Sequence, residues 1–87
     1  MSDAEPRDIQ IRRLKMRAMR RGIREMDLLL TAYADARLEH MSEVELRIFD
    51  QLLGENDQDL YAWVTGQRPA DGKFSDILAD IAENYQN

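Results

Sequence analysis

Apolar residues recur at helical spacing in five stretches of this 87-residue chain. Positions three, four and seven apart share one face of an α-helix, so each stretch predicts a helix with one buried face. We expect helices over residues 8–20, 23–40 (with either Ile23 or Arg24 as the first residue), 43–53, 58–65 and 74–85. The alternating, β-branched pattern of a strand does not occur in the sequence. The chain therefore predicts an all-α fold, a compact five-helix bundle with short loops.

The apolar faces of these helices define the expected core. It comprises Ile11, Leu14, Ala18, Met26, Leu29, Leu30, Tyr33, Leu46, Phe49, Leu52, Leu53, Leu60, Trp63, Val64, Phe74, Ile77, Leu78, Ile81 and Tyr85. Trp63 has an alternative role, because tryptophan is also enriched at protein interfaces. Its place in the helical pattern favours the core.

Two boundaries have clear local signals. Gly22 separates the first two helices, since glycine tolerates the backbone conformations that close one helix and open another. If Gly22 is the N-cap of the second helix, Glu25 is its N3 residue and forms one half of a capping box. Ser42 and Glu45 have the spacing of a complete capping box at the start of the third helix.

The other boundaries follow from glycine and polar caps. Gly54 is expected to end the third helix, Asp57 to cap the fourth and Gly66 to close it. Asp71 or Ser75 caps the fifth helix, and the sequence does not favour either one. Residues 1–7 show no periodicity and are expected to form a flexible tail. Residues 8–87 are then a single helical domain.

Composition narrows the setting of the protein. The sequence has no cysteine, which suits a reducing compartment. Residues 1–6 are too acidic and polar for a targeting peptide, and no apolar run is long enough for a membrane span. We expect a bacterial cytoplasmic location and no membrane insertion.

Charge is distributed unevenly, although the formal net charge is only −5. Residues 7–24 contain eight of the twelve Lys and Arg residues and one acid, whereas residues 25–87 contain four Lys and Arg and fourteen acids. Such a cluster is either a solvated face or an interaction surface. The second alternative arises because like charges repel each other unless the opposite charges of a partner or counterion balance them. Two functions remain open, namely protein binding and nucleic-acid binding through the basic first helix.

Residues for catalysis are scarce. His40 is the one histidine, and its place at a predicted helix end indicates a partner for the helix dipole. With no cysteine, one histidine, and serines that fall mostly at predicted helix caps, no nucleophile–base pair is evident, and neither a metal-ligand motif nor a phosphate-binding glycine loop is present. We therefore expect a protein that is not an enzyme and has no catalytic or metal site.

Several segments resemble one known family. Residues 21–25 (Arg-Gly-Ile-Arg-Glu) resemble the Arg-Gly-x-x-Glu signature of the SdhE-type family, whose members promote covalent FAD attachment to the flavoprotein subunit of succinate dehydrogenase. Residues 25–30 resemble the continuation of that motif. Residues 56–63 resemble the family's Asp-Pro-Asp-Leu-x-x-Trp segment, with Gln58 in place of the proline, and residues 68–70 resemble the link to its last helix. The order and spacing match over residues 12–85.

The resemblance implies a chaperone-like assembly factor. Its partner would be the flavoprotein subunit of succinate dehydrogenase or of fumarate reductase, and the FAD would be carried by that client rather than by this chain. The residues expected to bind the partner are Arg17, Arg21, Gly22, Arg24, Glu25 and Asp27. We expect a monomer. The alternative, a small helical nucleic-acid-binding protein, fits poorly with a sequence pI of about 4.7.

Overall fold

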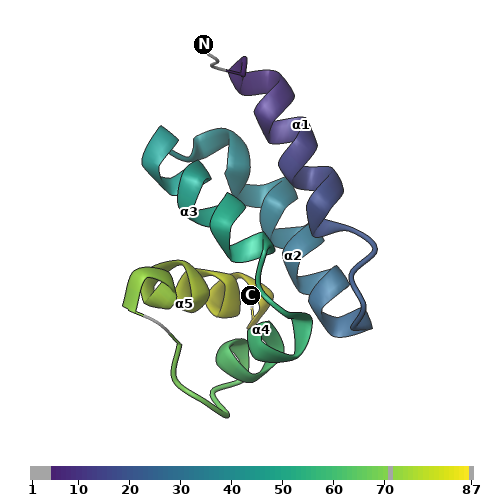
Figure 1. Ribbon diagram of the computed structural model, residues 1–87, viewed down its shortest axis with the longest axis vertical. Coiled ribbons are helices and arrows are strands. Elements are labelled where there is room, and N and C mark those ends of the chain that lie inside the picture. The colour runs from purple at the N-terminus through teal and green to yellow at the C-terminus, as the bar shows by residue number, and fades with distance from the viewer. Residues whose placement is uncertain (1–4, 71, 87) are drawn as a thin grey trace.

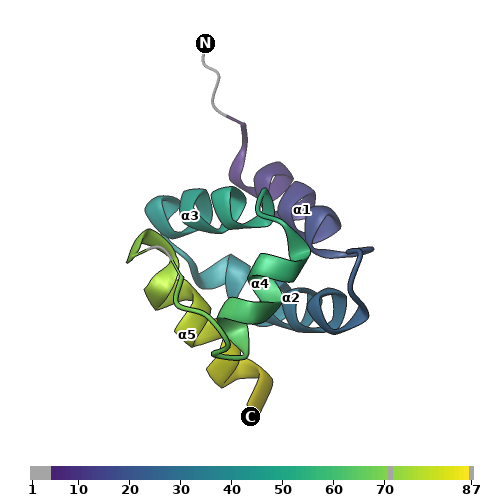
Figure 2. The same ribbon diagram turned by 60° about the horizontal axis from the view of Figure 1, so that its bottom comes forward.

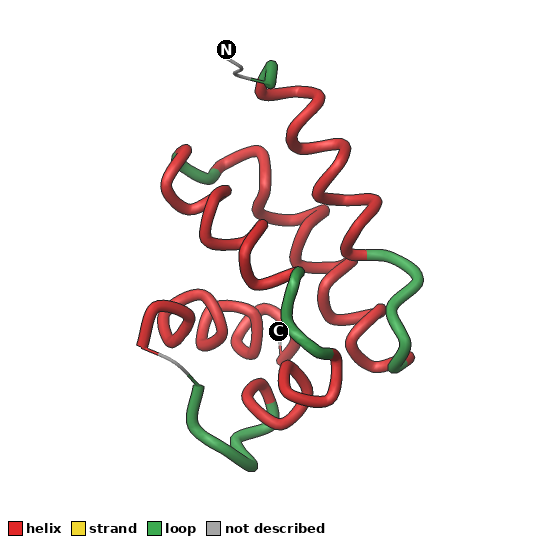
Figure 3. Tube along the Cα trace, viewed as in Figure 1, coloured by secondary structure: helices red, strands yellow, loops and turns green. Residues whose placement is uncertain are grey.

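The computed structural model describes residues 5–70 and 72–86, which form five α-helices joined by short loops (Figure 1). The helices are α1 (Arg7–Ala18), α2 (Arg24–Arg37), α3 (Glu43–Leu53), α4 (Asp57–Val64) and α5 (Gly72–Gln86), and the 3-10 turn η1 (Leu38–His40) follows α2. Figure 3 shows only helices and loops in this part of the chain. The predicted all-α five-helix bundle is confirmed. No helix within the described ranges has the length and apolar composition to cross a membrane.

Helix α2 is the centre of the bundle, since it contacts α1, α4 and α5. Helix α3 contacts α1 and α5. Figure 1 shows α1 and α3 towards one end of the molecule and α4 and α5 towards the other, with α2 between them. The loop between α1 and α2 lies close to the chain that leads from α3 into α4, because Arg21 and Gly22 both form hydrogen bonds to Asp57, at least 35 residues later in the sequence.

Apolar side chains from all five helices form one core, as the helical pattern predicts. At its centre the rings of Tyr33 and Phe49 lie 5.9 Å apart between centroids. Trp63 packs against Phe74 but is only half-buried, so it lies at the edge of the core. The assignment of Tyr85 to the core is wrong, because 62% of its surface is exposed. Figure 2 shows the reason: the last turn of α5 projects beyond the neighbouring helices.

The first junction differs from the prediction. Helix α1 ends at Ala18 rather than at Arg20, and Arg20 has the positive φ of 58° that glycine would adopt most easily. Its backbone N–H donates to Asp27 Oδ2 at 3.0 Å, which supports this turn from the side of α2. Gly22 has no positive φ, so its place here does not depend on the conformational freedom of glycine.

The start of α2 has no side-chain cap. Its N-cap is Ile23 rather than Gly22, so Glu25 is the second helical residue and not the N3 residue of a capping box. The predicted half capping box is therefore wrong. Glu25 still lies in the first turn, where its carboxylate meets the positive end of the helix dipole.

Helices α3 and α4 begin at polar caps. The capping box of α3 is confirmed: the N–H of Glu45 donates to Ser42 Oγ at 3.1 Å, and the N–H of Ser42 donates to Glu45 Oε1 at 2.8 Å. The cap of α4 is Asn56 and not Asp57, because the N–H of Gln58 donates to Asn56 Oδ1 at 2.8 Å. Asn and Asp are about equally good caps, so the sequence does not distinguish them, and the choice leaves the Asp57 carboxylate available for other contacts.

The first and the last helix each begin earlier than predicted. Helix α1 begins at Arg7, whose guanidinium donates to the carbonyl oxygen of Met41 at 2.6 Å, so Arg7 does not belong to a tail. Residues 1–4 of the expected tail lie outside the described residues. Helix α5 begins at Gly72, and Ser75 lies inside it with its hydroxyl donating to the Gly72 carbonyl at 2.9 Å. Ser75 is therefore not the cap, and Asp71 lies outside the described residues.

Tyr33 is expected to make the fold sensitive to alkaline pH. Burial of the Tyr33 ring and a hydrogen bond from its hydroxyl to Asp80 Oδ2, 2.7 Å long, raise the pKa of that hydroxyl above its usual value of about 10. The unfolded chain releases this proton more readily than the folded chain. The stabilisation that comes from Tyr33 is therefore fully present below pH 10. Between pH 10 and the raised pKa, the free energy of unfolding should fall by about 1.4 kcal/mol for each pH unit.

Urea unfolding at pH 8 and pH 11 measures this loss. Tyr33→Phe removes the titrating group, so the variant should lose less free energy of unfolding between the two pH values than the wild type. An equal loss in both proteins would assign the alkaline sensitivity to other groups.

Candidate functional site

The Arg21 side chain joins the loop after α1 to the segment between α3 and α4. Its Nε donates to Asp57 Oδ1 at 2.7 Å, and its terminal nitrogens donate to the carbonyl oxygens of Leu53 at 3.0 Å and Glu55 at 3.2 Å. Leu53 ends α3, so its carbonyl lacks a partner within the helix. Only 12% of the Arg21 side chain is exposed. Arg21 therefore fixes the position of one loop against the other.

Asp57 completes this contact with both carboxylate oxygens. While Oδ1 pairs with Arg21, Oδ2 accepts the backbone N–H of Gly22 at 2.6 Å. Hydrogen bonds to a charged group are shorter and stronger than neutral ones. We call the three residues Arg21, Gly22 and Asp57 the Arg21–Asp57 junction. Sequence reasoning missed Asp57, because a carboxylate at a helix start is explained locally as a cap.

Arg17 also forms its contacts inside the molecule. Its guanidinium pairs with Asp50 of α3, and that of Arg13 pairs with the same carboxylate at 3.2 Å. Arg13 additionally pairs with Glu5 at 3.0 Å, and the hydrogen bonds to Glu5 and Asp50 raise the pKa of the Arg13 guanidinium above its usual value. The two arginines thus attach α1 to α3, and the charge of Arg17 is already matched.

Much of the basic cluster is neutralised by acids from other parts of the chain. Lys15 pairs with Glu39 at 3.7 Å, in addition to the pairs of the arginines above. Four arginines of the cluster, Arg7, Arg12, Arg20 and Arg24, are exposed without an ion pair to another described residue, although Arg7 donates to the backbone carbonyls of Glu39 and Met41. A phosphate backbone is bound by a series of free cations, so this arrangement weakens the nucleic-acid alternative.

Glu25 lies differently from the residues of the junction. Its side chain is exposed, and neither it nor Arg24 forms a hydrogen bond or ion pair within residues 5–70 and 72–86. Glu25 lines a cavity of about 340 Å³ between α2, α4 and α5. The other residues that line it are Leu29, Tyr61, Val64, Thr65, Ala82 and Tyr85. A free carboxylate beside a partly apolar, aromatic cavity is suited to receive a side chain of a partner protein.

Asp27 is committed to the fold. One carboxylate oxygen accepts the N–H of Arg20, and the other accepts the hydroxyl of Thr31 at 3.3 Å. These bonds hold the turn before α2 against the first two turns of that helix. The half-buried Asp27 side chain therefore supports the surface on which Glu25 lies.

The six residues expected to bind a partner separate into two groups. Arg17, Arg21, Gly22 and Asp27 form contacts inside the molecule, whereas Arg24 and Glu25 face solvent. The structure also brings Tyr61 and Tyr85 to Glu25, which the sequence did not predict. The sequence did not predict that Tyr85 is exposed, because this residue fits the apolar pattern of the last helix.

Gly22→Ala is expected to destabilise the protein although the backbone of Gly22 is unstrained. An added Cβ would lie 3.1 Å from Asp57 Oδ2, so it would push the carboxylate away from the Gly22 N–H and from Arg21. Forcing extra atoms into a packed contact typically costs about 1–3 kcal/mol. Urea unfolding measures the change. Gly72→Ala is the matched control, since a Cβ there meets no atom of a described residue within 4 Å; an equally small loss in both variants would contradict a tight junction.

Comparison with known proteins relates residues 12–85 to the family described as flavinator of succinate dehydrogenase. Among similar proteins, succinate dehydrogenase assembly factor 2 of Schizosaccharomyces pombe is 41% identical over 81 residues, which are 91% of this chain and 58% of that protein. The protein of the same name from Meyerozyma guilliermondii is 38% identical over 88 residues, 95% of this chain and 65% of that protein. The one from Drosophila grimshawi is 34% identical over 86 residues, 95% and 58% respectively.

The chain spans less than two thirds of the length of these relatives. Their names describe them as mitochondrial, and they come from fungi and an insect, which contradicts the predicted bacterial cytoplasmic location. That prediction used the lack of cysteine, which reports a reducing environment but does not identify the compartment or the organism. None of these relatives supports the nucleic-acid alternative.

Proposed function

The chain belongs to the family of flavinators of succinate dehydrogenase, and we propose that it binds the flavoprotein subunit of succinate dehydrogenase and promotes covalent FAD attachment to that subunit. The flavoprotein of fumarate reductase is a second client of the same chemistry. The factor acts as a monomer, and the FAD stays with the client throughout.

The chain contributes binding and orientation rather than a reacting group. With one histidine and no cysteine in the sequence, the residues that form the flavin bond belong to the client. Binding favours the client conformation in which its FAD and the attachment residue are correctly oriented. Orientation alone accelerates reactions strongly, because the entropy cost of bringing the reacting groups together has been met before the reaction starts.

The observation that carries the proposal is the exposed Arg24–Glu25 pair beside the tyrosine-lined cavity. Both side chains lack a charged partner in the described part of the chain, while Arg17, Arg21 and Asp27 form their contacts inside the molecule. Glu25 would accept hydrogen bonds from a cationic or amide group of the client, and the apolar part of that group would enter the cavity between Tyr61 and Tyr85. The Arg21–Asp57 junction holds this surface in place.

Reconstitution of flavin attachment tests the proposal. Cells without their own assembly factor would express the client flavoprotein with this chain, with an empty vector, or with the unrelated control of a helical protein of similar size. Covalent flavin on the client, seen as fluorescence of the denatured subunit in a gel, should appear only with this chain. Flavin fluorescence at the level of the empty vector, with the chain present and folded, would contradict the proposal.

A further inference from the structure

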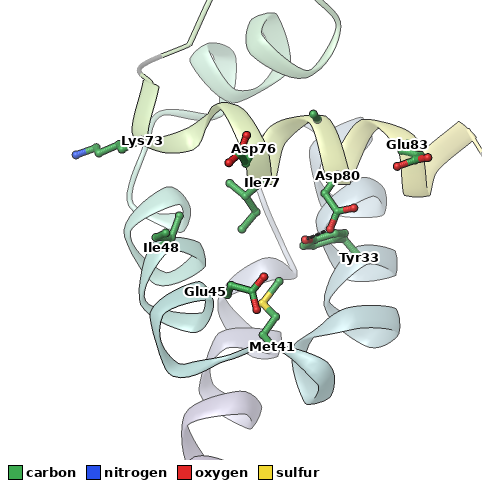
Figure 4. Close-up of a pocket in the computed structure, with 10 residues that line it drawn as sticks. Tyr33, Met41, Glu45, Ile48, Lys73, Asp76, Ile77, Asp80 and Glu83 are labelled. Atoms are coloured by element: carbon green, nitrogen blue, oxygen red, sulfur yellow. Dashed lines mark hydrogen bonds between the residues drawn. The ribbon is translucent and has the colours of Figure 1, made fainter.

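A second cavity lies between α2, α3 and α5, and Figure 4 shows the side chains around it. Its volume is about 440 Å³, larger than that of the cavity beside Glu25. The floor is apolar: Met41 and Ile77 are 7% and 9% exposed, and Ile48 is half-buried beside them. We call this cavity the α3–α5 groove. Methionine adapts its shape easily, so such a floor accommodates apolar side chains of different form.

The rim of the α3–α5 groove is acidic. Asp76, Asp80 and Glu83 follow each other at positions i, i+4 and i+7 of α5 and so lie on one face of the helix, while Glu45 lies across the groove on α3 (Figure 4). Lys73 is the one cation among the residues that line the groove, and its ammonium lies 5.0 Å from the centre of the Phe74 ring. Like charges on one helix face repel each other, so the rim favours a cationic occupant.

Two of these carboxylates are already matched. Asp80 accepts the hydroxyl of Tyr33 and pairs with Arg37 at 3.2 Å. Glu45 accepts the N–H of Ser42 in the capping box.

The two remaining carboxylates, Asp76 and Glu83, are exposed and form no hydrogen bond or ion pair with another residue of the described ranges. They lie seven residues apart, which is about 10 Å along α5 at a rise of roughly 1.5 Å per residue. The apolar floor lies beside them.

The geometry points to a docking site for a basic, amphipathic segment of a partner protein in the α3–α5 groove. Apolar side chains of the segment cover Met41, Ile48 and Ile77, and its Lys or Arg residues pair with Asp76 and Glu83. A helix with basic residues at i and i+7 and apolar residues between them at i+3 and i+4 presents these groups at the required spacing. Charge complementarity selects this occupant, because the unpaired carboxylates of Asp76 and Glu83 attract cations and repel an acidic segment. No group of three metal-binding side chains occurs among the described residues, so a metal ion does not explain the acidic rim.

A peptide titration tests this inference without the flavoprotein client, so its outcome is independent of the proposed function. The probe is a synthetic 14-residue helix with Lys at two positions seven apart and Leu between them, and the control peptide has Glu in place of both Lys residues. Both are titrated into the full, ¹⁵N-labelled chain. With the Lys peptide, we expect amide shifts to change in α5 and α3 around Ile77 and Ile48, and with the Glu peptide no binding.

The double variant D76N/E83Q should weaken binding of the Lys peptide by about tenfold, as the loss of two exposed ion pairs allows. The matched double variant D35N/E43Q removes the same charge from two exposed positions that do not line the groove, and its dissociation constant should stay within about twofold of the wild type. Circular dichroism confirms that both variants fold. Equal binding of the two peptides, equal weakening in the two variants, or shifts centred on the cavity beside Glu25 would overturn the inference.

Discussion

Replacing Arg21 with alanine is expected to lower the free energy of unfolding by about 3–5 kcal/mol, the cost of removing one member of a buried ion pair. The Arg21 side chain is 12% exposed and that of Asp57 19%, so solvent screens the pair only weakly. Without the guanidinium, the Asp57 carboxylate loses its charge partner, and the carbonyl oxygens of Leu53 and Glu55 lose their donor. Such a loss is a large share of the 5–15 kcal/mol that typically stabilises a domain.

Chemical denaturation of matched variants isolates this effect. Arg24→Ala is the control. It also removes an arginine, only three residues after Arg21, but Arg24 is exposed and has no ion pair in the described ranges. Its free energy of unfolding should change by less than about 0.5 kcal/mol. Arg21→Lys keeps the charge but not the planar fork that reaches several acceptors, so it should restore only part of the stability. Equal stabilities of the Arg21→Ala and Arg24→Ala variants would contradict a structural role of the junction.

The second large effect concerns binding of the client. Glu25→Gln is expected to weaken the complex with the flavoprotein by at least tenfold, since a charged hydrogen bond at an interface typically contributes about 2–5 kcal/mol when one partner is truncated. The change is nearly isosteric, and Glu25 forms no hydrogen bond or ion pair within the part of the chain that the structure describes. The variant loses only the interaction of this carboxylate with the helix dipole, so its free energy of unfolding should fall by no more than about 1 kcal/mol.

Calorimetric titration of the purified client with each variant measures this effect. Asp35→Asn is the matched control, because Asp35 is an exposed acid of the same helix and does not line the cavity beside Glu25. The control should bind like the wild type. If both variants weaken binding equally, the net charge of α2 is responsible, and the assignment of the binding site to Glu25 is wrong.

These two effects change how variants of the motif at residues 21–25 should be interpreted. An Arg21 variant that fails to support flavin attachment has two explanations, since it loses stability as well as any contact to the client. Gly22 has the same ambiguity, because a side chain there disturbs Asp57. Glu25 and Arg24 are the residues at which function and folding can be separated.

Helical periodicity predicted most of the fold because each helix has one clear apolar face. The capping box of Ser42 and Glu45 was also predictable, since both partners lie three residues apart. The first junction was not, because a local rule assigns the turn to Gly22, whereas a hydrogen bond to Asp27 holds Arg20 in the left-handed conformation. Local signals fail where a contact from another element decides the backbone.

The candidate site was predictable only in part, for the same reason. The motif gave Arg21, Gly22 and Glu25 together, but their separation into structural and exposed residues depends on Asp57, which lies 36 residues after Arg21. Likewise, the count of cations in residues 7–24 suggested a basic surface, but Asp50 of α3 pairs with two of them and Glu5 pairs with one of these two as well. Sequence spacing does not reveal such pairs, because they form only when the helices pack.

Covalent flavin on the client in cells that express Glu25→Gln is the most direct test of the central claim, that the exposed surface at Glu25 promotes flavin attachment while the Arg21–Asp57 junction maintains the fold. The fluorescence of the client subunit in a denaturing gel would be compared between the wild type, Glu25→Gln and Asp35→Asn at equal amounts of folded factor. We predict normal flavin with Asp35→Asn and a reduction of at least about tenfold with Glu25→Gln, in line with its weaker binding. Normal flavin attachment with a folded Glu25→Gln variant would contradict the account.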